Sequence, residues 1–190
     1  MAVEEPKFET ALRDGAFEVR VYPALIAAEV VVGGSHDKAS SEGFRLLAGY
    51  IFGGNTRRQS IAMTAPVVQA RSSGQSIAMT APVVQTGSPG AWTVRFIMPS
   101  AYSLDSLPVP NDQRVRLVTL PSTRLAVLRF SGLTRPNDVT RRTAELYAAI
   151  AAHRMHAIGP VSLARYDPPW TPWFMRRNEV MAPVQVDAPM

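Results

Sequence analysis

Polar and apolar residues alternate from Phe17 to Tyr22, which is the pattern of a strand with one buried face. The shorter run Thr10 to Leu12 precedes it, and Asp14-Gly15 between the two runs predicts a tight turn. After Pro23, the apolar run Ala24 to Val32 is typical of a fully buried strand. The chain therefore begins with a predicted hairpin and a third strand.

The stretch that follows Gly33-Gly34 has the periodicity of a helix. Ser35 can cap the first turn, and Gly53-Gly54 can end the last one. The buried positions expected for this helix are Ala39, Gly43, Leu46, Leu47 and Tyr50.

The second half of the chain repeats this order. Arg114 to Leu120 alternates and stops at Pro121, and the apolar run Arg124 to Phe130 follows it. A second helix is predicted from about Asn137, which can cap it. The residues at helical spacing are Val139, Thr143, Leu146 and Ile150.

The segment QSIAMTAPVVQ occurs twice, at Gln59 to Gln69 and at Gln75 to Gln85, and Met181 to Gln185 is a shortened copy. Each copy predicts an apolar strand. Pro66 cannot donate a ladder hydrogen bond, so we expect the first copy at an edge, a bulge or a corner of the sheet. The two full copies could pair as a hairpin, and a duplicated core strand without chemistry also explains them.

Each half thus predicts strand, strand, helix, strand. We expect one α+β domain over residues 1–190, in which two related β-β-α-β halves, at about 10–86 and 114–186, share one mostly antiparallel sheet. Between the halves, Trp92 to Met98 predicts a half-buried strand, and the proline-bearing stretch 99–113 predicts a surface crossover.

Composition describes a globular protein: 46% of its 190 residues are hydrophobic and 18% are charged. The longest apolar run contains Glu29 and is shorter than the roughly 20 residues of a membrane span, so no membrane partner is expected. The first residues lack a signal-peptide pattern, which predicts a cytoplasmic location.

The net charge of +5 comes from scattered arginines, which argues against a nucleic-acid partner. The lack of cysteine excludes disulfides and thiolate chemistry.

Three motifs, FEVRVY at Phe17 to Tyr22, IAMTAPV at Ile61 to Val67, and YDPP at Tyr166 to Pro169 leading to RRNEV at Arg176 to Val180, together resemble the SOUL, or haem-binding protein, family. They occur in the family's order over most of the chain. The resemblance implies a distorted β-barrel flanked by two helices. The duplicated plan is also similar to the small-molecule-binding effector domains of some bacterial transcription regulators.

The resemblance further implies a binding site with no catalytic residues, for haem as the cofactor or for another tetrapyrrole as the small-molecule partner. In the family such a ligand reportedly lies beside the first helix and the loop between the last two strands. The implied contacts in this chain are Phe44, Leu47, Ile51, Tyr166, Trp170, Trp173, Phe174, Arg176 and Arg177. Flat rings could hold a macrocycle and arginines could pair with propionates. Alternatively, the tryptophans only anchor the loop and the arginines face water.

No axial histidine from the first strand is available. Some family members have a histidine just before the tyrosine of the first-strand motif, where this chain has Val21. His36 lies at a helix start, and His153 and His156 lie near a helix end, so we interpret all three as structural or solvated. No metal site is predicted from them.

Nothing in the sequence argues strongly for an enzyme. It lacks a Gly-x-Ser-x-Gly elbow, a phosphate-binding glycine loop and a His-Glu-x-x-His helix. The alternative hypothesis is an effector-domain-like small-molecule sensor or hydrolase, with Glu29, Tyr166 and Glu179 as candidate acid or base groups. Glu29 interrupts an apolar strand, so its side of the strand faces water, or it is buried and then needs a partner such as Arg20 or favours its protonated form.

Overall fold

The computed structural model describes residues 4–71, 90–167 and 170–186. These residues form one sheet, two α-helices and a short 3-10 helix, η1. In chain order the elements are β1 Glu9–Asp14, β2 Phe17–Tyr22, β3 Leu25–Gly33, α1 His36–Ile51, β4 Val67–Arg71, β5 Ala91–Ile97, β6 Arg116–Leu120, β7 Thr123–Ser131, α2 Pro136–Ala152, β8 Met155–Ala157, β9 Ser162–Arg165, η1 Trp173–Met175 and β10 Arg177–Val186.

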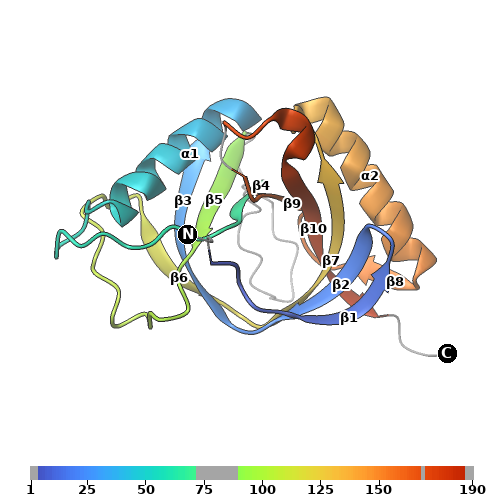
Figure 1. The fold of residues 1–190 in the computed structure, drawn as a ribbon, viewed down its shortest axis with the longest axis horizontal. Helices are drawn as coiled ribbons and strands as arrows, with labels where there is room; N and C mark the ends of the chain where they lie inside the picture. Colours follow the sequence, from blue (N-terminus) through green and yellow to red (C-terminus); the bar gives the residue numbers. More distant parts are fainter. Residues whose placement is uncertain (1–3, 72–89, 168–169, 187–190) are drawn as a thin grey trace, which may run out of the picture.

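A single ten-stranded antiparallel sheet carries both helices on one face. Its strands lie in the order β1-β2-β7-β10-β9-β4-β5-β3-β6, and β8 pairs with β10 outside this path. Directly paired residues share a face, and one such row crosses the middle of the sheet through Val94, Gln69, Leu163 and Val180. Val94 packs in the core cluster of α1 and Val180 in that of α2, so the helices cover the same face (Figure 1).

The expectation of a closed barrel is wrong. β1 and β6 end the strand order, and within the described residues no pairing joins them. The outer strand β1 carries Glu9, Arg13 and Asp14, and β6 is only five residues long and ends before Pro121. Charged side chains, short strands and proline all discourage further pairing, which leaves the sheet open.

The strand order is symmetric about the boundary between β9 and β4. Reading outward, β9, β10, β7 and β2 mirror β4, β5, β3 and β6. The first strand of each half pairs with the second strand of the other half, β2 with β7 and β6 with β3. Each half is therefore β-β-α-β-β rather than the expected β-β-α-β. The counterpart of β4 is β9, whereas the Met181 copy of the repeat lies in β10.

Helix α1 forms as its sequence pattern predicts. The Ser35 side chain accepts a hydrogen bond from the Lys38 amide, and the buried positions include those expected from the spacing. Gly43 permits the close packing of α1 on β5, because a Cβ atom there would lie 2.6 Å from Cγ2 of Val94. Gly53, with φ of +108°, follows the C-cap residue.

Helix α2 begins about two residues earlier than predicted, with Pro136 in the first turn and Arg135 at the N-cap. Asn137 is therefore not the cap. Proline suits a first turn because its missing N–H would have no helical acceptor there. Leu146 and Ile150 are the buried residues of α2, and they pack on β2, β7 and β10.

The repeated segment forms a strand only at its end. β4 begins at Val67, after Pro66, which cannot donate to a ladder. Before it, Ile61 is buried in the core, and the Thr64 hydroxyl donates to the carbonyl of Ile97. The second copy, residues 75–85, lies outside the described residues, so the hairpin between the copies stays a prediction.

Candidate functional site

The three residues of α1 that the family resemblance implies as ligand contacts lie in different environments. Leu47 and Ile51 are buried beneath α1, in the core cluster shared with β3 and β5. Phe44 is partly exposed, and its ring packs edge-on against Phe96 with centroids 5.3 Å apart. Of the three, Phe44 has free surface for a ligand.

The loop between β9 and β10 presents apolar side chains to solvent. Trp170 is 83% exposed, and Trp173, Phe174 and Met175 are more than half exposed. Trp173 and Phe174 meet edge to face, with centroids 5.7 Å apart. Figure 1 shows this loop at the end of the molecule where α1 and α2 begin. Such exposure argues against an anchoring role and leaves ligand contact as a prediction.

The two arginines after this loop have partners within the protein. Arg176 donates from Nε to the carbonyl of Thr171 at 2.8 Å. The Arg177 guanidinium forms ion pairs with Glu179 at 3.0 Å and with Glu5 at 3.1 Å, and it lies 3.8 Å from the centroid of the Tyr166 ring. A propionate would have to compete with these contacts.

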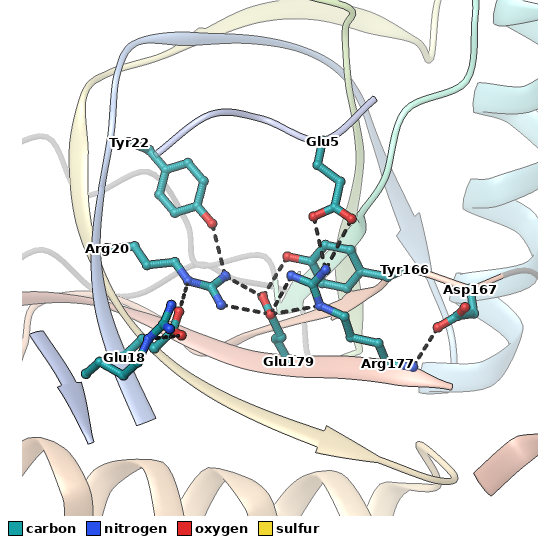
Figure 2. Close-up of polar contacts among 9 residues, drawn as sticks. Glu5, Glu18, Arg20, Tyr22, Tyr166, Asp167, Arg177 and Glu179 are labelled. Carbon is teal, nitrogen blue, oxygen red and sulfur yellow. Dashed lines mark hydrogen bonds and ion pairs between the residues drawn. The ribbon is translucent and has the colours of Figure 1, made fainter. Parts of the chain in front are cut away.

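Glu179 is the centre of a buried polar network on the face of the sheet away from the helices, and its side chain is 0% exposed. Its Oε1 accepts hydrogen bonds from Arg20 and Arg177, both at 3.0 Å. Its Oε2 accepts from Arg20 at 2.8 Å and from the Tyr166 hydroxyl at 2.6 Å. Arg20 also donates to Glu18 at 2.6 Å. Figure 2 shows Arg20, Tyr166 and Arg177 converging on the Glu179 carboxylate, with Glu18 beside Arg20. We call these five residues the Glu179 network.

The Glu179 network holds charges in place rather than offering a reactive group. Burial acts to raise the pKa of Glu179, but the hydrogen bonds from Arg20 and Tyr166 and the charges of Arg20 and Arg177 outweigh it, so the pKa lies below its ordinary value. Burial, together with the negative charge of Glu179, raises the pKa of Tyr166 far above its ordinary value. An ionised carboxylate whose oxygens are fully hydrogen-bonded is a weak base. The network therefore gives no support to the hydrolase hypothesis.

The third candidate acid, Glu29, lies elsewhere and is paired. Its strand, β3, is four positions from β10 in the sheet order. The buried carboxylate lies 2.6 Å from Arg95 and 2.8 Å from Arg116, its direct neighbours in β5 and β6. The interpretation that Glu29 faces water is thus wrong. Cross-strand neighbours neutralise it rather than Arg20, because directly opposed side chains are the closest ones on a sheet.

A groove of about 780 Å³ lies over the centre of the sheet face that carries the helices. It is bounded by the start of α1 on one side and by α2, from Pro136 to Tyr147, on the other. Gln69 in β4 and Leu163 in β9 line it at the symmetry boundary of the sheet. Other lining residues are Ser35, His36, Trp92, Val139, Thr143 and Tyr147. Two further cavities measure about 290 and 270 Å³. Small-molecule sites generally occupy roughly 300–1,000 Å³ and are mostly apolar with a few polar groups. Of these three cavities, the groove matches that description in volume.

His36 carries an unpaired nitrogen at the wall of this groove. Its side chain is 10% exposed, and Nδ1 lies 2.9 Å from Oδ1 of Asp37. Its Nε2 is buried and has no hydrogen-bond partner in the part of the chain that the structure describes. The Trp92 ring stands nearly perpendicular to the imidazole, with centroids 5.1 Å apart. An unpaired buried polar atom costs about 1–3 kcal/mol, which a ligand contact could recover.

Arg165 ties the starts of both helices to the strands below the groove. Its Nη1 donates to Oγ of Ser40 in α1 at 2.9 Å and to Oε1 of Gln69 at 3.1 Å, and its Nε donates to Oγ1 of Thr134 before α2 at 3.2 Å. Gln69 in turn donates to the backbone carbonyl of His36 at 3.0 Å. These bonds fix the backbone of His36 relative to β4 and β9.

The sequence offers little sign of this groove. Its residues come from five separate stretches of the chain and form no motif. The one available signal is His36-Asp37, a histidine and a carboxylate directly after a helix cap, and we interpreted that histidine as structural or solvated.

The described residues contain no group of three or more histidine, aspartate or glutamate side chains that could hold a metal ion. They also contain no helix that is both long enough and apolar enough to cross a membrane.

Comparison with known protein families gives one match that spans most of the chain. The family described as SOUL heme-binding protein matches residues 3–73 and 68–183. Heme-binding protein 1 of Xenopus laevis is 30% identical over 171 residues, which are 88% of this chain and 84% of that protein. Heme-binding protein 1 of Xenopus tropicalis is 29% identical over the same shares.

Solved structures resemble this fold at low sequence identity. The EcmrR C-terminal domain has a TM-score of 0.65 at 8% identity, with 95% of this chain and 99% of that chain covered. An uncharacterized conserved protein from Listeria innocua has a TM-score of 0.60 at 14% identity, with 89% and 92% covered. At these identities the likeness concerns the fold alone: an effector-domain-like sheet with two helices.

Proposed function

The chain belongs to the SOUL heme-binding protein family, and we propose that it binds haem or another tetrapyrrole in the groove between α1 and α2. One observation in particular supports this location. The groove combines a volume of about 780 Å³ with a buried, unpaired histidine nitrogen at its wall. The other two cavities are each less than half as large.

The lining of the groove suits a flat, largely apolar ligand. Trp92, Val139 and Leu163 offer apolar contact, and Thr143 and Gln69 add a few polar atoms. Propionates would find cations at the starts of both helices, where Lys38 and Arg135 are exposed. Lys38 follows the groove residue His36 by two positions, and Arg135 directly precedes the groove residue Pro136. Bound haem would supply iron-centred ligand binding and one-electron chemistry, and the protein would supply the apolar surroundings.

The loop between β9 and β10 provides a second contact in this proposal, as the family resemblance implies. Trp170, Trp173 and Phe174 are exposed at the end of the molecule where both helices begin, so they could cover one edge of a ligand. Leu47 and Ile51 drop out of the proposed contact set because the core buries them.

Titration of the protein with ferric haem tests the proposal. We expect a Soret band that differs from that of free haem and saturates at one haem per chain, with the colour retained on a desalting column. Iron-free protoporphyrin, followed by its fluorescence, should bind as well because the contacts are mainly apolar. A haem spectrum identical to that of free haem at equimolar protein, with no retention of either compound, would overturn the proposal.

A further inference from the structure

We propose that Nε2 of His36 is the axial ligand for the iron of haem in the groove, and that Asp37 orients the imidazole for this task. The inference rests on the proposed function and assigns a specific residue to it. It places iron ligation on the first turn of α1 and not on β2, which carries Val21.

The contact between His36 and Asp37 decides which nitrogen carries the lone pair. An ionised carboxylate only accepts hydrogen bonds, so in the neutral ring the proton lies on Nδ1, which faces Oδ1 of Asp37 at 2.9 Å. Nε2 then carries an unshared electron pair, which is what an iron ligand requires. Metal-binding histidines in proteins commonly donate their other ring N–H to a carboxylate in this way.

The same nitrogen is the one without a partner. The imidazole is nine-tenths buried, it lines the groove, and Nε2 has no hydrogen bond within the described residues. A merely structural histidine in such a place would normally satisfy both ring nitrogens. The geometry therefore describes a ring that Asp37 orients on one side and that carries an unpaired nitrogen on the other. Because that nitrogen is buried, the imidazole has to turn toward the groove for iron to reach it.

The backbone of His36 is held firmly enough to position a ligand. Its carbonyl accepts from Gln69 at 3.0 Å, and Gln69 is itself bound by Arg165 at 3.1 Å. The neighbouring Trp92 donates from Nε1 to the carbonyl of Gly34 at 3.1 Å, so the wall beside the imidazole is also fixed. Sites supported by such bonds lose little freedom when a ligand binds.

The other two histidines of the chain are placed differently. His153 lies 3.2 Å from Asp14 and stacks on Phe17 with the ring planes 3° apart. His156 lies in β8, and neither residue lines the groove. A spectroscopic signature of histidine ligation would therefore report on His36.

The test compares His36→Gly with the wild-type protein and with His156→Ala as the matched control. We expect His36→Gly to lose the histidine-ligated absorption and electron paramagnetic resonance signature of ferric haem and to weaken haem binding about tenfold or more. Added imidazole should restore the signature, because the substitution leaves room for a free ring. Binding of iron-free protoporphyrin should stay within about twofold, since it has no iron to ligate. His156→Ala should match the wild type.

Failure of this inference and failure of the proposed function give different results. If the wild type binds haem and His36→Gly gives the same spectrum and affinity, His36 is not the ligand and the inference is overturned. If the wild type retains neither haem nor protoporphyrin, the proposed function itself is overturned. Asp37→Asn should keep the ligation signature but weaken haem binding by less than His36→Gly, because it removes the orienting group and not the ligand.

Discussion

The Glu179 network and the groove beside His36 lie on opposite faces of one sheet and use their polar groups in opposite ways. At Glu179 each carboxylate oxygen accepts at least two hydrogen bonds, and the arginines around it are paired. At the groove a buried ring nitrogen has no partner in the described part of the chain, and space for a ligand lies beside it. A charged group whose hydrogen bonds are all made within the protein stabilises the fold, whereas a polar group that lacks a hydrogen bond and lies beside a groove is a candidate for ligand binding.

The first test of this comparison removes the charge of Glu179, the centre of the Glu179 network. Glu179→Gln should lower the free energy of unfolding by about 3–5 kcal/mol, because it removes the buried charge that neutralises Arg20 and Arg177 and leaves Arg20 paired with Glu18 alone. Urea unfolding followed by circular dichroism measures this change. Glu145→Gln, which breaks an exposed pair with Arg142, is the control and should cost no more than about 1 kcal/mol. If both variants lost the same small amount, the network would not be a main source of stability.

A substitution that fills the groove should have the converse effect, with ligand binding lost and stability kept. Thr143→Trp places a large ring from α2 into the groove, and we expect haem affinity to fall at least tenfold, or about 1.4 kcal/mol. Ala144→Trp is the matched control because Ala144 is exposed on the same helix and does not line the groove. Equal haem affinities for the two variants would show that the ligand lies elsewhere.

The pH dependence of the free energy of unfolding should report on the Glu179 network. The pKa of Glu179 in the folded state lies below the ordinary value of 4.5, so the unfolded chain binds its proton first as pH falls. The stabilisation from Glu179 is therefore complete above about pH 4.5 and is lost as pH falls below it. We expect the free energy of unfolding of the wild type to decline more steeply below pH 4.5 than that of Glu179→Gln. Parallel urea titrations from pH 7 downward measure the difference, and identical slopes would contradict it.

The smallest expected effect concerns the exposed loop. Replacing Trp170 and Trp173 together with alanine should weaken haem binding about fivefold, because two exposed aromatic contacts at about 0.5 kcal/mol each, the lower end of the usual range, total about 1 kcal/mol. The far-UV circular dichroism should not change, because both side chains are exposed. A loss larger than that of Thr143→Trp would move the main contact from the groove to the loop.

Much of the fold is predictable because short-range sequence patterns specify its helices, strands and turns. The hairpin at Asp14-Gly15, the helix capped by Ser35 and the strands on either side of Pro121 all agree with the structure to within two residues. Their signals are turn residues, caps and periodicity, which act between close neighbours in the chain. The unpredicted strands β8 and β9 have three and four residues, too few for a period to be seen.

The candidate site was less predictable, because its properties depend on pairings between distant segments. The family resemblance pointed to Trp170, which the structure exposes and which stays a proposed contact. Residue type pointed to Glu29, which the structure neutralises through Arg95 and Arg116. That His36 lines a groove is visible only in the folded structure. The absence of a partner for Nε2 is a property of the folded surroundings and leaves no trace in the sequence.

The sequence by itself determined the elements, the duplicated order of the chain and the resemblance to its family, because caps, turns, periodicities and motifs are local. Only the tertiary structure decided that the sheet stays open, that the halves exchange their first strands, and that β4 meets β9 between the two helices. Those outcomes come from pairing and packing across the chain. They saturate the carboxylate of Glu179 and leave one atom of His36, Nε2, without a hydrogen-bond partner among the described residues.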